Sequence, residues 1–126
     1  MTDISLYPFK FSPIYKNKIW GGSKINQLLG KSDAPLTLCG ERWEISGLPN
    51  DLSQVINGFL AENTLDELLE VYMGDLVGEH VFENFGTHFP LLIKFIDAAE
   101  NLSVQVHPDE EGATHIPNAH AKTELW

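Results

Sequence analysis

Three polar side chains that can bind a metal ion or an anion alternate along one short segment near the C-terminus. They are Ser103, Gln105 and His107, and the residues between them are apolar. This alternation predicts a β-strand over residues 102–107 with one apolar face and one polar face. Alternate residues on one face lie about 6–7 Å apart, so Gln105 and His107 could both reach one metal ion. On spacing alone, a solvated polar face without a metal is the better explanation of the pattern.

Two further positions carry side chains suited to the same chemistry. Lys122 and Glu124 lie two residues apart in a segment that is predicted to be extended. Lys94 interrupts an apolar run at 91–96, which is typical of a buried strand. Because a buried ammonium group needs a partner, Lys94 is expected either to contact a ligand or to extend to the sheet edge. A turn at 97–101 predicts a hairpin between the strands at 91–96 and 102–107.

The elements that position these residues include a further strand and a helical segment. The strand is expected at 40–46, with Glu41 and Trp43 on one face. The helical segment covers about residues 64–86. Its first helix begins with a capping box formed by Thr64 and Glu67, and a second helix is expected from 75 to about 84.

The N-terminal third contains two local signals. Trp20 is followed by two glycines, which predicts either a tight turn or a close approach of two backbone segments beside a core tryptophan. Ser23 is expected to cap a short helix that ends at Gly30.

Composition limits the class of protein. The 126 residues suffice for one domain, residues 1–126, and the net charge of −10 argues against nucleic acid or an anionic membrane as a partner. A small anionic ligand needs only a few local cations and remains possible. Cys39 is the only cysteine, which excludes an internal disulfide and favours a cytoplasmic location.

The polar segment resembles the signature of a known family. Residues 102–109 match every position of the pattern Leu-Ser-(Ile/Val)-Gln-x-His-Pro-(Asp/Asn) of the type I mannose-6-phosphate isomerases, which are zinc-dependent cupins. Residues 122–126 resemble the next family block, Gly-Lys-Thr-Glu-x-Trp, with Ala121 in place of the glycine. Residues 19–22 and 40–44 resemble weaker N-terminal blocks. The resemblance therefore covers essentially the whole chain and implies a mainly β fold, a partial cupin or jelly roll with a small helical insert.

The resemblance also implies roles for individual residues. Zinc ligands would be His107, Glu124 and the side-chain oxygen of Gln105. The substrate-binding and catalytic positions that it implies are Ser103 and Lys94 for the phosphate, Lys122 for proton transfer or electrostatic stabilisation beside the sugar, and Glu41 and Trp20 for the pocket wall. It assigns no role to His115 or His120.

The implied reaction is the interconversion of mannose 6-phosphate and fructose 6-phosphate through a cis-enediolate. Family members are considerably longer and supply another zinc-binding histidine and an arginine from later strands. The chain is therefore expected to be the N-terminal part of such an isomerase, with little or no activity alone. Two alternatives are a non-catalytic, metal-dependent sugar-phosphate-binding cupin and a half-barrel that forms a homodimer through its open sheet edge.

Overall fold

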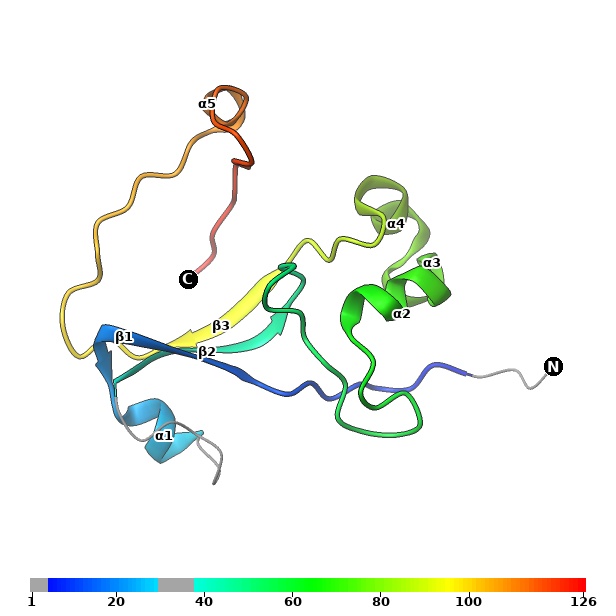
Figure 1. Cartoon of the computed structure of the whole chain (residues 1–126), viewed down its shortest axis with the longest axis horizontal. Coiled ribbons are helices and arrows are strands. Elements are labelled where there is room, and N and C mark those ends of the chain that lie inside the picture. The colour runs from blue at the N-terminus through cyan, green and yellow to red at the C-terminus, as the bar shows by residue number, and fades with distance from the viewer. Residues whose placement is uncertain (1–4, 30–37) are drawn as a thin grey trace.

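A three-stranded antiparallel sheet forms the centre of the computed structural model, which describes residues 5–29 and 38–126 (Figure 1). In chain order the elements are β1 (Ile14–Gly22), α1 (Lys24–Leu28), β2 (Cys39–Ser46), α2 (Leu65–Tyr72), α3 (Gly74–Val77), α4 (Glu79–Phe85), β3 (Leu92–Ile96) and α5 (Glu110–Ala113). Strand β2 lies between β1 and β3. Helix α1 lies at one end of the sheet, and α2, α3 and α4 lie at the other (Figure 1). Within the described ranges, no helix is long and apolar enough to cross a membrane.

The strand register brings four polar or aromatic side chains to one face of the sheet. Lys16 on β1 pairs with Glu41 on β2, and Trp43 on β2 pairs with Lys94 on β3. Paired residues and residues two apart on one strand share a face. We call the set Lys16, Glu41, Trp43 and Lys94 the lysine–tryptophan face. The predicted strand at 40–46 is confirmed, and its central place in the sheet explains how it reaches side chains of both neighbours.

Strand β1 includes Trp20, Gly21 and Gly22, but its register shifts between Asn17 and Gly22, which both pair with Cys39. The chain is therefore irregular at this point, and the expected close backbone approach is confirmed. A Cβ atom on Gly21 would lie 2.5 Å from the backbone nitrogen of Gly40. Trp20, whose side chain lies beside Gly40, belongs to the core with a relative exposure of 8%. Glycine at position 21 therefore lets β1 pass directly over β2.

The first N–H group of helix α1 donates a hydrogen bond to a distant residue. The buried Asp97 carboxylate, just beyond β3, accepts a hydrogen bond of 2.7 Å from the Lys24 backbone N–H. Ser23, the expected cap, makes no side-chain capping bond. Ser23 therefore occupies the predicted N-cap position without supplying the capping bond, because an ionised carboxylate is a stronger acceptor than a hydroxyl and tertiary folding places it at the helix start. The expected helix end at Gly30 lies outside the described residues.

We expect Asp97→Ala to destabilise the fold by about 1–2 kcal/mol, because it removes this cap and leaves the Lys24 N–H without an acceptor. Urea denaturation monitored by circular dichroism measures the change. Ser23→Ala is the matched control and is expected to change stability by less than about 0.5 kcal/mol. A larger loss for Ser23→Ala than for Asp97→Ala would contradict this assignment of the cap.

The helical segment begins as predicted and divides differently. Thr64 and Glu67 form the expected capping box at the start of α2, in which the Thr64 N–H donates to Glu67 Oε2 at 3.0 Å. The single helix expected from 75 to 84 is wrong, since α3 and α4 are separated at Gly78. The φ of Gly78 is +91°, a conformation that a continuous α-helix does not contain. Leu65, Leu68 and Leu69 of α2 are buried, as is Val55.

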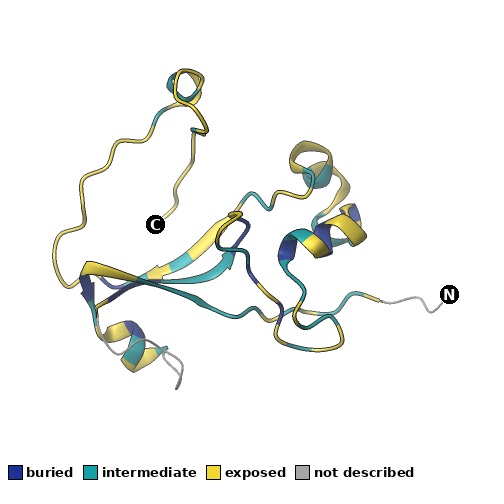
Figure 2. Cartoon of the chain, viewed as in Figure 1, coloured by how far each residue is buried: buried dark blue, intermediate teal, exposed yellow. Residues whose placement is uncertain are grey.

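The region from β3 onwards is more exposed than the sequence predicts (Figure 2). Strand β3 forms as expected, but Ile93 and Phe95 are about half exposed instead of buried. Residues 102–107 form no strand and no hairpin with β3. A strand needs a hydrogen-bonding neighbour, and β3 pairs only with β2 among the described residues. Residues 98–126 instead form an arm that leaves the sheet and carries α5. After α5 the arm runs back in the direction of the sheet (Figure 1).

The single cysteine lies inside the sheet. Cys39 has no exposed surface, and its Sγ lies 3.4 Å from the Glu41 carbonyl oxygen. Burial raises the pKa of the Cys39 thiol, which keeps the group protonated and unreactive. The unfolded chain ionises first as the pH rises. The protonated Cys39 thiol therefore contributes to the stability of the fold below about pH 8.5, and this contribution is lost as the pH rises through the higher folded-state pKa.

We expect a thiol reagent such as Ellman's reagent to label Cys39 at least about a hundredfold more slowly in buffer than in concentrated urea, because only the unfolded chain exposes the thiolate. The absorbance of the released thiolate follows the reaction. Equal rates in both solvents would mean that the sheet opens freely around Cys39.

Candidate active site

Glu41 is the centre of the polar contacts on the sheet. Its side chain is largely buried, and each carboxylate oxygen has a different partner. Oε1 accepts a hydrogen bond from the Lys94 ammonium at 3.2 Å, and Oε2 accepts one from the Trp43 indole N–H at 2.6 Å. An ionised carboxylate only accepts hydrogen bonds, so both oxygens are used. Lys94 lies on the edge strand β3 and forms an ion pair with Glu41, and its expected contact with a ligand stays a prediction.

Trp43 lies between two ammonium groups on this face. The Lys16 Nζ is 4.6 Å from the centre of the Trp43 ring, and the Lys94 Nζ is 5.9 Å from it. Lys16 is also held by Asp51 at 2.6 Å. Cation–π attraction and the hydrogen bond to Glu41 together fix the indole in one orientation.

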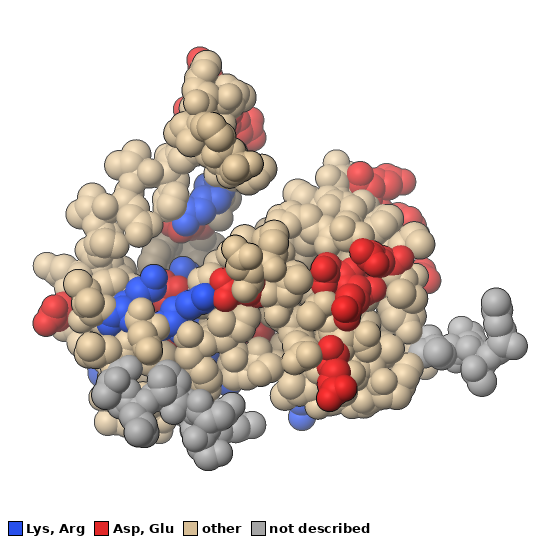
Figure 3. Space-filling model, viewed as in Figure 1, with Lys and Arg blue, Asp and Glu red and all other residues tan. Residues whose placement is uncertain are grey.

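Charged side chains are unevenly distributed over the molecule (Figure 3). On the face shown, Lys and Arg side chains gather over the sheet and near the arm, whereas Asp and Glu side chains gather over the helices. The chain has a net charge of −10, yet its cations are concentrated where the candidate residues lie. This distribution is compatible with a small anionic ligand at the sheet.

The arm carries the other candidate residues in two pairs. The Gln105 Nε2 donates a hydrogen bond of 3.2 Å to Ser103 Oγ, so alternate side chains of this segment point to the same side. The Lys122 ammonium lies 2.6 Å from Glu124 Oε1. His107 is exposed, like both pairs. Two members of the predicted polar row, Ser103 and Gln105, therefore lie together without the predicted strand.

Glu124 responds to charges from several parts of the chain. The hydrogen bond from Lys122 holds the pKa of the Glu124 carboxyl below its usual value. Burial opposes this shift, and the positive charges of Lys122, His107 and Lys94 reinforce it. Glu124 therefore stays ionised at neutral pH, as a metal ligand must be.

The donor set fits zinc in kind. His107 offers an imidazole nitrogen and Glu124 a carboxylate oxygen, both of which zinc prefers, and Gln105 offers a less usual amide oxygen. Structural and catalytic zinc sites usually contain at least three protein ligands. Within residues 5–29 and 38–126, no group of three or more His, Cys, Asp or Glu side chains is placed to hold a metal ion. Zinc binding by His107, Glu124 and Gln105 therefore stays a prediction from the donor types.

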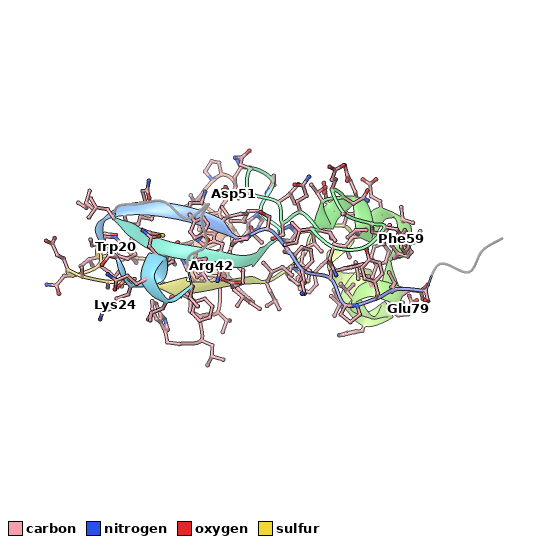
Figure 4. All side chains as sticks on the ribbon, turned by 90° about the horizontal axis from the view of Figure 1, so that it is seen from below. Trp20, Lys24, Arg42, Asp51, Phe59 and Glu79 are labelled. Atoms are coloured by element: carbon pink, nitrogen blue, oxygen red, sulfur yellow. The ribbon has the colours of Figure 1, made fainter. Side chains whose placement is uncertain are left out.

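The structure does not bring all candidate residues to one place. The candidate residue Trp20 lies beside Lys24 at the α1 end of the sheet, whereas Arg42, the sequence neighbour of the candidate Glu41, lies in its middle (Figure 4). Phe59 and Glu79 mark the opposite end. The backbone oxygen of Trp20 accepts hydrogen bonds from the N–H groups of residues 99 and 100, where the arm starts. Trp20 thus fixes the origin of the arm.

Sequence reasoning did not assign a role to Trp43 or Lys16, although both contact candidate residues or their partners. The available signal was the spacing of Glu41 and Trp43, which places them on one strand face. The contribution of Lys16 depends on the pairing of β1 with β2, which no local pattern specifies.

Comparisons with known proteins give a consistent result. Residues 8–124 match the family model described as phosphomannose isomerase type I, catalytic domain. Mannose-6-phosphate isomerase ManA of Bacillus subtilis is 38% identical over 121 residues, which cover 94% of this chain and 36% of that protein. The mannose-6-phosphate isomerase of Streptococcus mutans is 41% identical over 109 residues, which cover 86% of this chain and 33% of that protein. The chain thus spans about a third of the length of these relatives.

Solved structures agree with this result. The mannose 6-phosphate isomerase of Bacillus subtilis superposes with a TM-score of 0.69 at 38% identity, over 86% of this chain and 32% of that one. A zinc-bound mannose 6-phosphate isomerase superposes with a TM-score of 0.66 at 28% identity, over 86% of this chain and 30% of that one. The predicted partial cupin fold is therefore confirmed. The sheet, the arm and the family match together establish that this chain belongs to the type I phosphomannose isomerase family.

Proposed function

We propose that this chain forms the N-terminal part of the active site of a zinc-dependent mannose-6-phosphate isomerase. The observation that carries the proposal is the match of residues 8–124 to the catalytic-domain model of that family. The similar proteins of Bacillus subtilis and Streptococcus mutans are mannose-6-phosphate isomerases, which supports the same reaction for this chain. Because the chain covers only about a third of those relatives, we propose that it binds the sugar phosphate with little or no turnover by itself.

In this proposal the phosphate is held by Lys94 and Ser103. An ammonium and a hydroxyl group both donate hydrogen bonds to a phosphate dianion. Lys94 has three N–H donors and uses one for Glu41, so two remain for the phosphate. Glu41 and Trp20 form parts of the wall beside this position.

The reaction moves a proton from C2 of mannose 6-phosphate to C1 and shifts a proton between the neighbouring oxygens. We assign Lys122 to a position beside the sugar, where its ammonium group stabilises negative charge or exchanges a proton. His107, Glu124 and Gln105 would hold zinc, which when bound supplies polarisation of the sugar's carbonyl and hydroxyl oxygens.

We expect the chain to bind mannose 6-phosphate at least about tenfold more tightly than mannose, since only the former carries the dianion that Lys94 and Ser103 recognise. Isothermal titration calorimetry of zinc-supplemented protein measures both affinities. Lys94→Met is expected to remove most of the difference, whereas Lys10→Met, at an exposed lysine outside the lysine–tryptophan face, is the matched control.

An assay that couples fructose 6-phosphate formation to a dye measures turnover in the same samples. Equal affinity for mannose and mannose 6-phosphate would refute the proposed substrate. Turnover at a rate typical of enzymes, on the order of 10 per second, would refute the proposal that this chain has little or no activity by itself.

A further inference from the structure

We propose that Trp43 is a positioning residue that fixes the Lys94 ammonium through Glu41. Trp43 is not among the residues to which the sequence assigns a role in the reaction. Its contacts instead lead to Lys94. The role of this arrangement in binding phosphate rests on the proposed function, whereas the arrangement itself does not.

Both carboxylate oxygens of Glu41 have a hydrogen-bond partner. Its carboxylate is largely buried, and a buried charge is stable only when it is paired and hydrogen-bonded. Trp43 satisfies Oε2 with a bond of 2.6 Å, which leaves Oε1 for Lys94 at 3.2 Å. Without the indole N–H, the carboxylate can rotate so that both oxygens compete for the same ammonium group.

The indole of Trp43 is itself held by neighbouring groups. Trp43 and Lys94 are direct cross-strand partners, so the ring lies beside the lysine stem. Lys16 contacts the ring, and Asp51 holds Lys16 in turn. The indole is therefore immobilised by groups of β1 and of the loop after β2. A phenylalanine ring keeps the hydrophobic and cation–π contacts but lacks the N–H donor.

These contacts restrict the side chain of Lys94. A free lysine side chain samples many rotamers, and a phosphate that binds it has to restrict them. The two hydrogen bonds that link Trp43, Glu41 and Lys94 restrict the rotamers of Lys94 before a ligand binds. They leave two N–H donors of the ammonium group unused. Preorganisation of this kind raises affinity without adding a contact to the ligand.

Nuclear magnetic resonance of the ligand-free chain tests the arrangement. The ¹H–¹⁵N signal of the Lys94 ammonium is assigned by its loss in Lys94→Arg. Trp43→Phe and Glu41→Gln are each expected to move this signal and speed its exchange with water. In the double variant the two effects are expected not to add, because they break the same connection. Trp126→Phe is the matched control, since Trp126 is 82% exposed.

The affinity for mannose 6-phosphate is measured on the same proteins. Trp43→Phe is expected to weaken it about fivefold to tenfold and to leave the affinity for mannose unchanged. Amide spectra that match wild type outside β2 and β3 identify folded variants. If Trp43→Phe does not fold, Glu41→Gln, which keeps an acceptor for the indole, decides the question.

The outcomes separate the two hypotheses. An unmoved Lys94 signal in a folded Trp43→Phe or Glu41→Gln variant would overturn the positioning role, whatever the chain binds. A moved signal with unchanged mannose 6-phosphate affinity would overturn its importance for phosphate. If the wild-type chain binds no mannose 6-phosphate, the proposed function fails, and the Lys94 signal alone still decides whether Trp43 positions Lys94.

Discussion

His107→Ala is expected to weaken zinc binding by this chain about a hundredfold or more. His107 is the only imidazole in the candidate donor set, and its replacement leaves a carboxylate and an amide oxygen as ligands. Loss of a residue that merely orients a zinc ligand already costs about ten- to a hundredfold in affinity. Competition with a chromophoric zinc chelator measures the affinity, and elemental analysis gives the zinc content per chain.

The matched control for this experiment is His115→Ala. His115 is also exposed and lies on the same arm beyond α5, but it has no assigned role. We expect its replacement to leave the zinc affinity within about twofold of wild type, well below the tenfold that 1.4 kcal/mol represents. Wild-type affinity in His107→Ala, or an equal loss in both variants, would show that zinc binds elsewhere or without specificity.

Gly21→Ala is expected to destabilise the fold by about 3 kcal/mol or more. The added Cβ would lie 2.5 Å from the Gly40 backbone nitrogen and 2.8 Å from the Cys39 carbonyl carbon. These are backbone atoms of β2, so no side-chain rotation relieves the contact and the strands must separate. Urea denaturation followed by tryptophan fluorescence measures the loss, since Trp20 is the adjacent core residue.

Gly112→Ala is the control that separates this steric effect from a general effect of replacing glycine. Its Cβ would lie 3.2 Å from Asp109 Oδ1, a side-chain atom, and the residue belongs to α5. Alanine is favoured over glycine in a helix by up to about 1 kcal/mol, so we expect unchanged or slightly higher stability. A Gly21→Ala variant as stable as Gly112→Ala would contradict the close packing of β1 on β2.

Local signals in the sequence predict those elements that are stabilised by neighbouring residues. The capping box of Thr64 and Glu67 predicts the start of α2 because its hydrogen bonds span three residues. The strand around Glu41 follows from its β-branched and aromatic composition. Residues 109–112 after Pro108 likewise predict a short helical turn, and α5 forms there, where Asp109 Oδ1 accepts from the Gly112 N–H at 2.7 Å.

Elements that depend on distant partners are predicted less well. The alternation at 102–107 identifies residues suited to a strand, but a strand also needs a neighbour, and the described part of the chain offers none. The exposure of β3 has the same cause, since an apolar run shows a capacity for burial and does not supply the covering layer. The contact of Trp43 with Glu41 belongs between these cases, because the shared face is predictable and the hydrogen bond is not.

The cap of α1 by Asp97 has a consequence for the order of folding. The two partners are 73 residues apart in the sequence, and closing so long a loop is slow compared with forming a helical turn. During synthesis, α2 can form as soon as its own residues are available, whereas the corner between β1 and α1 has to wait for Asp97. Pulsed hydrogen exchange during refolding should therefore protect the Leu68 amide before the Lys24 amide.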